Sequence, residues 1–110
     1  MSDTSHLVPL CNATDVTKDT PARGMLGGQA YAIFTRDGLY YVTQDLCTHG
    51  PGFLSEGFVE DCEVECPFHL GRFNFITGAP TSPPCTEALR VWTVHLVDGK
   101  ICIDPEETHP

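Results

Sequence analysis

Cys47-Thr48-His49 and, further along, Cys66-Pro67-Phe68-His69 are the two stretches around which this 110-residue chain is organised. Each stretch offers one thiolate and one imidazole, and sixteen residues separate His49 from Cys66. Two Cys and two His, supplied pairwise by two loops, are enough to hold one metal centre. Two centres fit this set: a tetrahedral zinc ion, and a two-iron, two-sulfide cluster with Cys on one iron and His on the other.

The spacing of the first pair favours the cluster. Zinc sites usually place two to four residues between paired ligands, whereas only Thr48 lies between Cys47 and His49. Alternate side chains of an extended loop point to the same side, so this Cys and this His both face one elongated centre. Glycines follow both pairs, and glycine lets a backbone approach a cofactor closely. They are Gly50, Gly52 and Gly71.

C-x-H, a sixteen-residue spacer and C-x-x-H together resemble the Rieske iron–sulfur motif. The likeness spans about residues 7–104 and is closest to the small soluble Rieske-type ferredoxins of bacterial aromatic-ring-hydroxylating dioxygenase systems. Residues 66–73 are similar to that family's second cluster loop, and residues 77–89 resemble its proline loop and the following strand. The resemblance implies one Rieske-type [2Fe-2S] cluster, in loops at about 46–53 and 65–72 beside a proline loop at about 78–85. Its ligands would be Cys47, His49, Cys66 and His69.

The resemblance also implies a function. A soluble one-electron carrier of this type passes electrons from an NAD(P)H-dependent ferredoxin reductase to the Rieske centre of a terminal aromatic-ring-hydroxylating oxygenase. It has no catalytic residue of its own, and the outer nitrogens of His49 and His69 face outward where electrons enter and leave. Two alternatives stay open: a small Rieske subunit of another oxidoreductase, nitrite-reductase-like or monooxygenase, and a structural zinc module that binds a partner. The sequence names neither the aromatic substrate nor the docking residues.

Size and composition limit the number of domains, the cellular location and the kinds of partner that we expect. A chain of 110 residues forms a single domain, 1–110, with no room for a second, catalytic iron domain. Residues 1–5 lack the basic and apolar regions of a signal peptide, and no apolar run approaches the roughly 18 residues of a membrane span. We therefore expect a cytoplasmic monomer without a membrane partner. Fifteen acidic against six basic residues give a formal charge of -9, which excludes a basic nucleic-acid-binding surface and suits steering toward positively charged partners.

The remaining cysteines and histidines are expected to be ordinary. A reducing cytosol keeps thiols free, and free Cys packs as a small apolar residue. We assign this role to Cys11, Cys62, Cys85 and Cys102. The histidines outside the two pairs are assigned no metal: His6, His95 and His109. Candidates to shield the cluster from water are Phe53, Leu54, Phe68, Pro83 and Pro84.

The hydrophobic pattern predicts eight to ten short strands joined by hairpins, which is typical of an all-β sandwich or small barrel. Residues 29–36 and 39–43 alternate on either side of Asp37-Gly38, a strong hairpin signal, and Asp98-Gly99 predicts a second hairpin turn. Residues 7–11 are predicted as an edge strand because of Pro9, residues 89–97 as one long strand, and residues 105–110 as a disordered tail. The resemblance implies the same fold class: an antiparallel Rieske-type sandwich or barrel with a two-loop cluster-binding subdomain.

The same comparison predicts a low reduction potential. Rieske potentials run from about −150 to +300 mV. High-potential members carry a disulfide between the two loops and two hydroxyl donors near the cluster. The matching positions here are Gly52 and Phe68 for the disulfide, and Gly71 and Phe73 for the hydroxyls. Without these groups, we predict a potential near the low end of the range.

Overall fold

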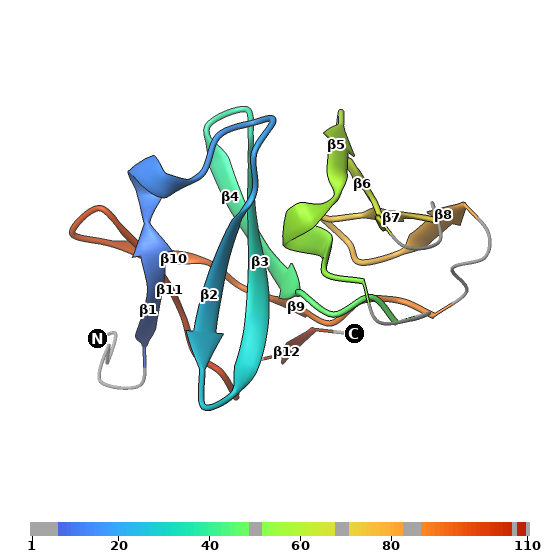
Figure 1. The fold of residues 1–110 in the computed structure, drawn as a ribbon. Helices are drawn as coiled ribbons and strands as arrows, with labels where there is room; N and C mark the ends of the chain where they lie inside the picture. Colours follow the sequence, from blue (N-terminus) through green and yellow to red (C-terminus); the bar gives the residue numbers. More distant parts are fainter. Residues whose placement is uncertain (1–6, 49–51, 68–70, 83–86, 107, 110) are drawn as a thin grey trace.

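Short antiparallel strands make up most of the computed structural model, which describes residues 7–48, 52–67, 71–82, 87–106 and 108–109 (Figure 1). In the described residues, two 3-10 turns interrupt the strands, η1 (Ala13–Asp15) and η2 (Leu54–Glu56). No helix in these ranges is long and apolar enough to cross a membrane. The strands are β1 (Val8–Asn12), β2 (Ala22–Leu26), β3 (Gln29–Arg36), β4 (Leu39–Gln44), β5 (Phe58–Glu60), β6 (Glu63–Glu65), β7 (Arg72–Asn74), β8 (Pro80–Ser82), β9 (Val91–Trp92), β10 (His95–Val97), β11 (Lys100–Ile103) and β12 (Thr108–His109).

These strands form three antiparallel sheets. The first has the order β1-β11-β10, the second β12-β9-β4-β3-β2 and the third β5-β6-β7-β8. The third sheet forms a separate lobe at one end of the molecule, beside the other two sheets (Figure 1). The all-β, antiparallel fold class predicted from the sequence is therefore confirmed. We call the first two sheets the base and the third sheet, with the loops around it, the lobe.

Strand β3 stands between two hydrophobic cores, because its residues alternate between its two faces. On one face, Tyr31 and Ile33 enter what we call the base core. On the other face, Ala32 and Phe34 enter the lobe core. The buried members of the base core are Val16, Tyr31, Ile33, Val42, Trp92, Ile101 and Ile103. Those of the lobe core are Ala32, Phe34, Cys47, Leu54, Val59, Val64, Cys66, Phe73, Phe75 and Leu89.

The two predicted hairpins are present. Asp37 and Gly38 join β3 to β4 with φ angles of 54° and 80°, and Asp98 and Gly99 join β10 to β11 with 51° and 75°. Two successive positive φ values are the signature of the tight hairpin turn that Asp-Gly favours. The edge position of β1 is also confirmed, since it pairs with β11 alone, with a register shift between Pro9 and Cys11.

The prediction of one long strand over residues 89–97 is wrong. After Trp92 the chain passes from the second sheet to the first, so this stretch is divided into β9, which pairs with β4, and β10, which pairs with β11. Alternation along the sequence continues through this crossing, so the pattern gave no sign of it. Strand β2 was not predicted from the sequence, yet it pairs along its whole length with β3.

The segment 105–110, predicted as a disordered tail, contains described residues that contact the base. Thr108 and His109 form β12, which pairs with Trp92 and Val91 of β9. The indole Nε1–H of Trp92 donates a hydrogen bond of 3.2 Å to the carbonyl oxygen of Pro105. A buried indole N–H needs an acceptor, and this segment supplies it while covering the outer edge of β9.

Candidate metal centre

Two of the four predicted ligands lie in the lobe core. The side chains of Cys47 and Cys66 are 3% and 0% exposed, and the same hydrophobic cluster contains both. The other two, His49 and His69, lie outside the described residues, so the complete set of four stays a prediction. Burial of two thiols in one small core is what a sulfur-ligated centre shielded from water requires.

Each of these cysteines begins a loop that is closed by a hydrogen bond from the cysteine's own backbone N–H. The N–H of Cys47 donates to the carbonyl oxygen of Gly52 at 2.9 Å, and the N–H of Cys66 donates to that of Gly71 at 2.8 Å. Both bonds close loops of the same length. The second loop runs from β6 to β7, a strand–loop–strand arrangement as predicted. The first runs from β4 to the turn η2.

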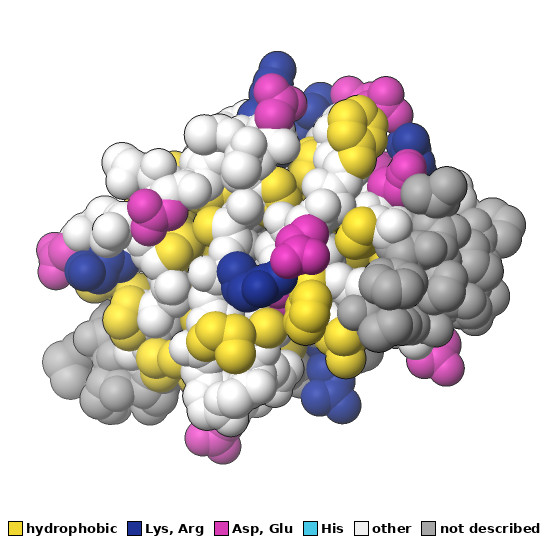
Figure 2. Space-filling model, viewed as in Figure 1, with side chains coloured by type: hydrophobic (Ala, Val, Ile, Leu, Met, Phe, Trp, Pro, Cys, Tyr) yellow, Lys and Arg dark blue, Asp and Glu magenta, His cyan; other side chains and the backbone are white. Residues whose placement is uncertain are grey.

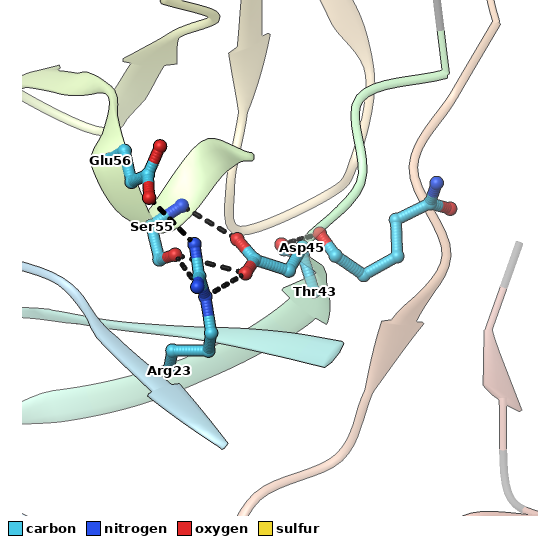
Figure 3. Close-up of polar contacts among 6 residues, drawn as sticks. Arg23, Thr43, Asp45, Ser55 and Glu56 are labelled. Atoms are coloured by element: carbon cyan, nitrogen blue, oxygen red, sulfur yellow. Dashed lines mark hydrogen bonds and ion pairs between the residues drawn. The ribbon is translucent and has the colours of Figure 1, made fainter. Parts of the chain in front are cut away.

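A buried carboxylate that the sequence reasoning missed closes the neck of the first loop. Asp45 is 0% exposed. Its Oδ1 accepts the backbone N–H of Ser55 at 2.7 Å, and its Oδ2 accepts the Ser55 hydroxyl at 2.9 Å and Arg23 Nε at 2.6 Å (Figure 3). The Asp45 carbonyl also accepts the N–H of Leu54 at 2.7 Å. These contacts join the residues just before and just after the loop.

Arg23 reaches this carboxylate from β2. Its Nη2 lies 3.1 Å from Glu56 Oε2, and its guanidinium carbon lies 4.5 Å from the centre of the Phe53 ring. Partial burial lowers the pKa of Arg23, but the hydrogen bonds and charges of Asp45 and Glu56 outweigh it and raise the pKa above its ordinary value. Arg23 is therefore a permanent cation beside the loop. We call Arg23, Asp45, Ser55 and Glu56 the neck network (Figure 3).

The proline loop region approaches the first loop. Thr48, which directly precedes His49, donates its hydroxyl to the carbonyl oxygen of Glu87 at 2.9 Å. Of the predicted shielding residues, Leu54 is fully buried in the lobe core, while Phe53 is 36% exposed and stacks on Arg23. The others, Phe68, Pro83 and Pro84, lie outside the described residues.

Comparison with known proteins identifies the family to which this chain belongs. The model of the Rieske [2Fe-2S] domain matches residues 6–93. This chain belongs to the Rieske family. It is 42% identical over 93 residues to the anthranilate 1,2-dioxygenase ferredoxin subunit of Burkholderia cepacia, with 84% of this chain and 86% of that protein covered. It is 40% identical over 104 residues to the ferredoxin component of the p-cumate 2,3-dioxygenase system of Pseudomonas putida, covering 93% and 88%.

A solved structure agrees. A chain in the complex of reduced oxygenase and oxidized ferredoxin of carbazole 1,9a-dioxygenase is 36% identical, with a TM-score of 0.85 and coverage of 94% of this chain and 97% of that one. The protein is thus a Rieske-type ferredoxin, an electron carrier rather than an enzyme, and its cofactor is one Rieske-type [2Fe-2S] cluster. The two buried thiols in backbone-closed loops fit that cofactor.

Asn74 is the last residue of β7, the strand that follows the second Rieske loop. Its Oδ1 accepts the N–H groups of Ile76 and Thr77 at 2.8 and 3.1 Å, and its Nδ2 lies 3.7 Å from the Cys62 sulfur. Asn74 therefore shapes the turn after β7. Cys62 is a free thiol, as predicted, and so are Cys11 and Cys102, while Cys85 lies outside the described residues.

Acidic side chains surround the start of β7, where the chain leaves the second Rieske loop. Arg72 Nη1 lies 2.9 Å from Glu60 Oε1 and 3.6 Å from Glu63 Oε1, and its Nη2 lies 3.8 Å from Glu65 Oε2. The hydrogen bond that Arg72 donates to Glu60 raises the pKa of Arg72 above its ordinary value, with Glu65 and Glu63 contributing. An arginine thus lies beside each Rieske loop, Arg23 from the base and Arg72 from the lobe, despite the chain's net negative charge.

A surface groove of about 760 Å³ borders the first Rieske loop. Leu46, Thr48 and Phe53 of the loop contribute to one wall, and Arg23 and Met25 of β2 contribute to another. Exposed hydrophobic side chains gather around a basic side chain on this face of the molecule (Figure 2). Met25 and Leu46 are 57% and 49% exposed. The neck network therefore reaches solvent through Arg23, although Asp45 itself does not.

Proposed function

We propose that this Rieske ferredoxin is the cytoplasmic electron carrier of a bacterial aromatic-ring-hydroxylating dioxygenase system. It accepts single electrons from an NAD(P)H-dependent ferredoxin reductase and delivers them to the Rieske centre of a terminal oxygenase. The observation that carries the proposal is the burial of Cys47 and Cys66 in one core of a domain whose relatives are named as ferredoxin components of such systems.

In this proposal Cys47 and Cys66 are the thiolate ligands, and His49 and His69 complete the set. When bound, the cluster supplies a one-electron redox couple. The chain's own residues supply the environment: the lobe core excludes water from the two sulfurs, and the closing bonds to Gly52 and Gly71 hold each loop in shape. The protein works as a monomer, which size-exclusion chromatography with light scattering tests.

The surroundings of the loops support a low potential. Phe73 is 0% exposed and carries no hydroxyl, and the matching position nearer the ligands is Gly71. Side-chain donors to the sulfurs favour the reduced state, so their absence at these two positions lowers the potential. We expect a midpoint below zero, within the lower part of the range of about −150 to +300 mV. Redox titration followed by EPR measures it, and a midpoint above zero would contradict the prediction.

Two measurements test the function. The dithionite-reduced protein should give the EPR signal of a mixed His/Cys cluster, with a lower average g value than an all-Cys cluster. Mixed with an oxidised terminal oxygenase in a stopped-flow instrument, the reduced protein should be reoxidised at a rate that saturates with oxygenase concentration. The -9 charge predicts slower association at higher salt, since screening weakens steering. A reduced protein that oxygenases of this class fail to reoxidise would overturn the proposal.

A further inference from the structure

The two Rieske loops are held at their necks in different ways. The second loop is bracketed by paired strands, with Glu65 opposite Arg72 in the β6–β7 ladder. Among the described residues, the first loop shows no such ladder: its two arms meet in an isolated bridge between Leu46 and Phe53. Something else must therefore hold the arms of the first loop together just outside that bridge.

Asp45 and Ser55 occupy that place. Asp45 lies two residues before Cys47, and Ser55 lies just beyond the closing bond to Gly52. Three hydrogen bonds join the two arms here: two from Ser55 to the Asp45 carboxylate and one from Leu54 to the Asp45 carbonyl. The side chain of Asp45 thus does the work that a second pair of strand residues does in the other loop.

This arrangement depends on Arg23. A carboxylate that is 0% exposed is costly unless it is paired and hydrogen-bonded. Arg23 supplies the opposite charge at 2.6 Å, also contacts the Ser55 hydroxyl at 3.0 Å, and is itself held by Glu56 and by the Phe53 ring. Hydrogen bonds to charged groups are about twice as strong as neutral ones. β2, far from the loop in sequence, is thereby fastened to both of its arms.

We propose that Arg23 and Asp45 are positioning residues for the cluster: together they fix the neck of the first loop and so determine how firmly Cys47 and His49 retain iron. The inference rests on the proposed ligand role of these two residues. It requires that loosening the neck releases iron without unfolding the domain. It also requires that the charges of the pair act on the potential of the nearby centre.

Iron release to a ferrous chelator tests the first requirement. Arg23→Gln and Asp45→Asn should release iron about tenfold faster than the wild type, the lower end of the effect of residues that orient metal ligands. Arg23→Lys, which keeps the charge but not the fork of donors, should give an intermediate rate. Arg36→Gln is the matched control, because Arg36 is 34% exposed against 36% for Arg23 and pairs only with exposed acids, Asp37 and Asp61.

General loss of stability needs its own control. Ile103→Val removes a methylene from the base core, where Ile103 is 0% exposed, and should lower the unfolding temperature while leaving iron release at the wild-type rate. If Arg23→Gln and Asp45→Asn release iron no faster than Arg36→Gln and Ile103→Val, the inference is overturned.

The midpoint potential is the readout that a purely structural role would not move. Arg23→Gln leaves a negative charge unpaired and should lower the potential, whereas Asp45→Asn leaves a positive charge unpaired and should raise it. Shifts of opposite sign support the inference, and unchanged potentials in both variants overturn it. A wild-type protein without a Rieske EPR signal would instead refute the proposed function, so the two failures are distinguishable.

Discussion

Strand β3 contributes residues to both the base core and the lobe core, but the two cores differ in the kinds of side chain they contain. The base core is built from aliphatic and aromatic side chains, with Tyr31 and Trp92 edge to face at 4.8 Å. The lobe core sets two thiols among phenylalanines, with Phe34 and Phe75 stacked at 4.6 Å. The two predicted thiolate ligands therefore belong to a hydrophobic core and do not lie on its surface. A change in the lobe core should alter both stability and the cluster, whereas a change in the base core should alter stability alone.

The largest expected effect is that of removing a lobe thiol from the ligand set. Cys66→Ser should abolish the Rieske EPR signal and most bound iron, because the predicted set of four loses a thiolate. Circular dichroism should still report the antiparallel sheets of the base. Cys62→Ser is the control in the same lobe: Cys62 is a half-buried free thiol and its loss should leave the signal intact. A signal that persists in Cys66→Ser would mean that the ligands are wrongly assigned.

The next contrast sets one aromatic residue of each core against the other. Phe75→Ala and Trp92→Ala should each lower the free energy of unfolding by about 3–5 kcal/mol, because both side chains are buried. Only Phe75→Ala should also speed the bleaching of the cluster's visible absorbance at a temperature where both variants remain folded. Should Phe75→Ala prove too unstable, Phe75→Leu serves in its place. Equal bleaching rates in Phe75→Ala and Trp92→Ala would contradict the expectation that only the lobe core affects the cluster.

Two glycines provide a smaller comparison. A Cβ on Gly57, in the lobe, would lie 2.2 Å from the carbonyl oxygen of Glu65, whereas a Cβ on Gly24, in the base, would lie 2.7 Å from the Leu10 Cβ. Overpacking of this kind costs about 1–3 kcal/mol. We expect Gly57→Ala to be the more destabilising in urea titration, since it meets the backbone just before Cys66. The reverse order would show that the lobe yields more easily than the base.

The smallest effect concerns a thiol of the base. Burial, with the nearby Asp15 and Cys102, raises the pKa of Cys11 to about 11 from 9.0. The unfolded chain therefore loses this proton first as the pH rises, so the stability contributed by Cys11 is complete below about 9 and disappears as the pH passes through about 11. Native protein at pH 8 should react slowly with iodoacetamide at Cys11, as peptide mass spectrometry measures. Labelling as fast as in urea would show that the folded base does not protect the Cys11 thiol from the reagent.

Local signals in the sequence predicted the local features of the fold. Asp37-Gly38 and Asp98-Gly99 make the expected hairpins, β3 alternates as expected, and Trp92 is in the core. The crossing between β9 and β10 was missed because nothing in the alternation of residues 89–97 shows which sheet each half joins.

The sequence likewise indicated one part of the site and missed another. The ligand motif paired Cys47 with Cys66, and both lie in one buried cluster, while their role as ligands stays a prediction. Asp45 was missed because its importance depends on Arg23 and Ser55, which are 22 and 10 residues away along the chain. A carboxylate at the end of a strand is more often solvated than buried. Only the folded arrangement of β2, β4 and η2 shows that this one must be neutralised.

The closing bonds of the two Rieske loops have one more consequence. The donor in each is the amide of a predicted ligand, Cys47 to Gly52 and Cys66 to Gly71. Opening a loop at that bond therefore exposes the backbone proton of that cysteine, so deuterium uptake at these two amides counts loop openings directly. The opening rate of each loop can therefore be measured separately. We expect the loop with the faster uptake to be the one that releases the cluster first.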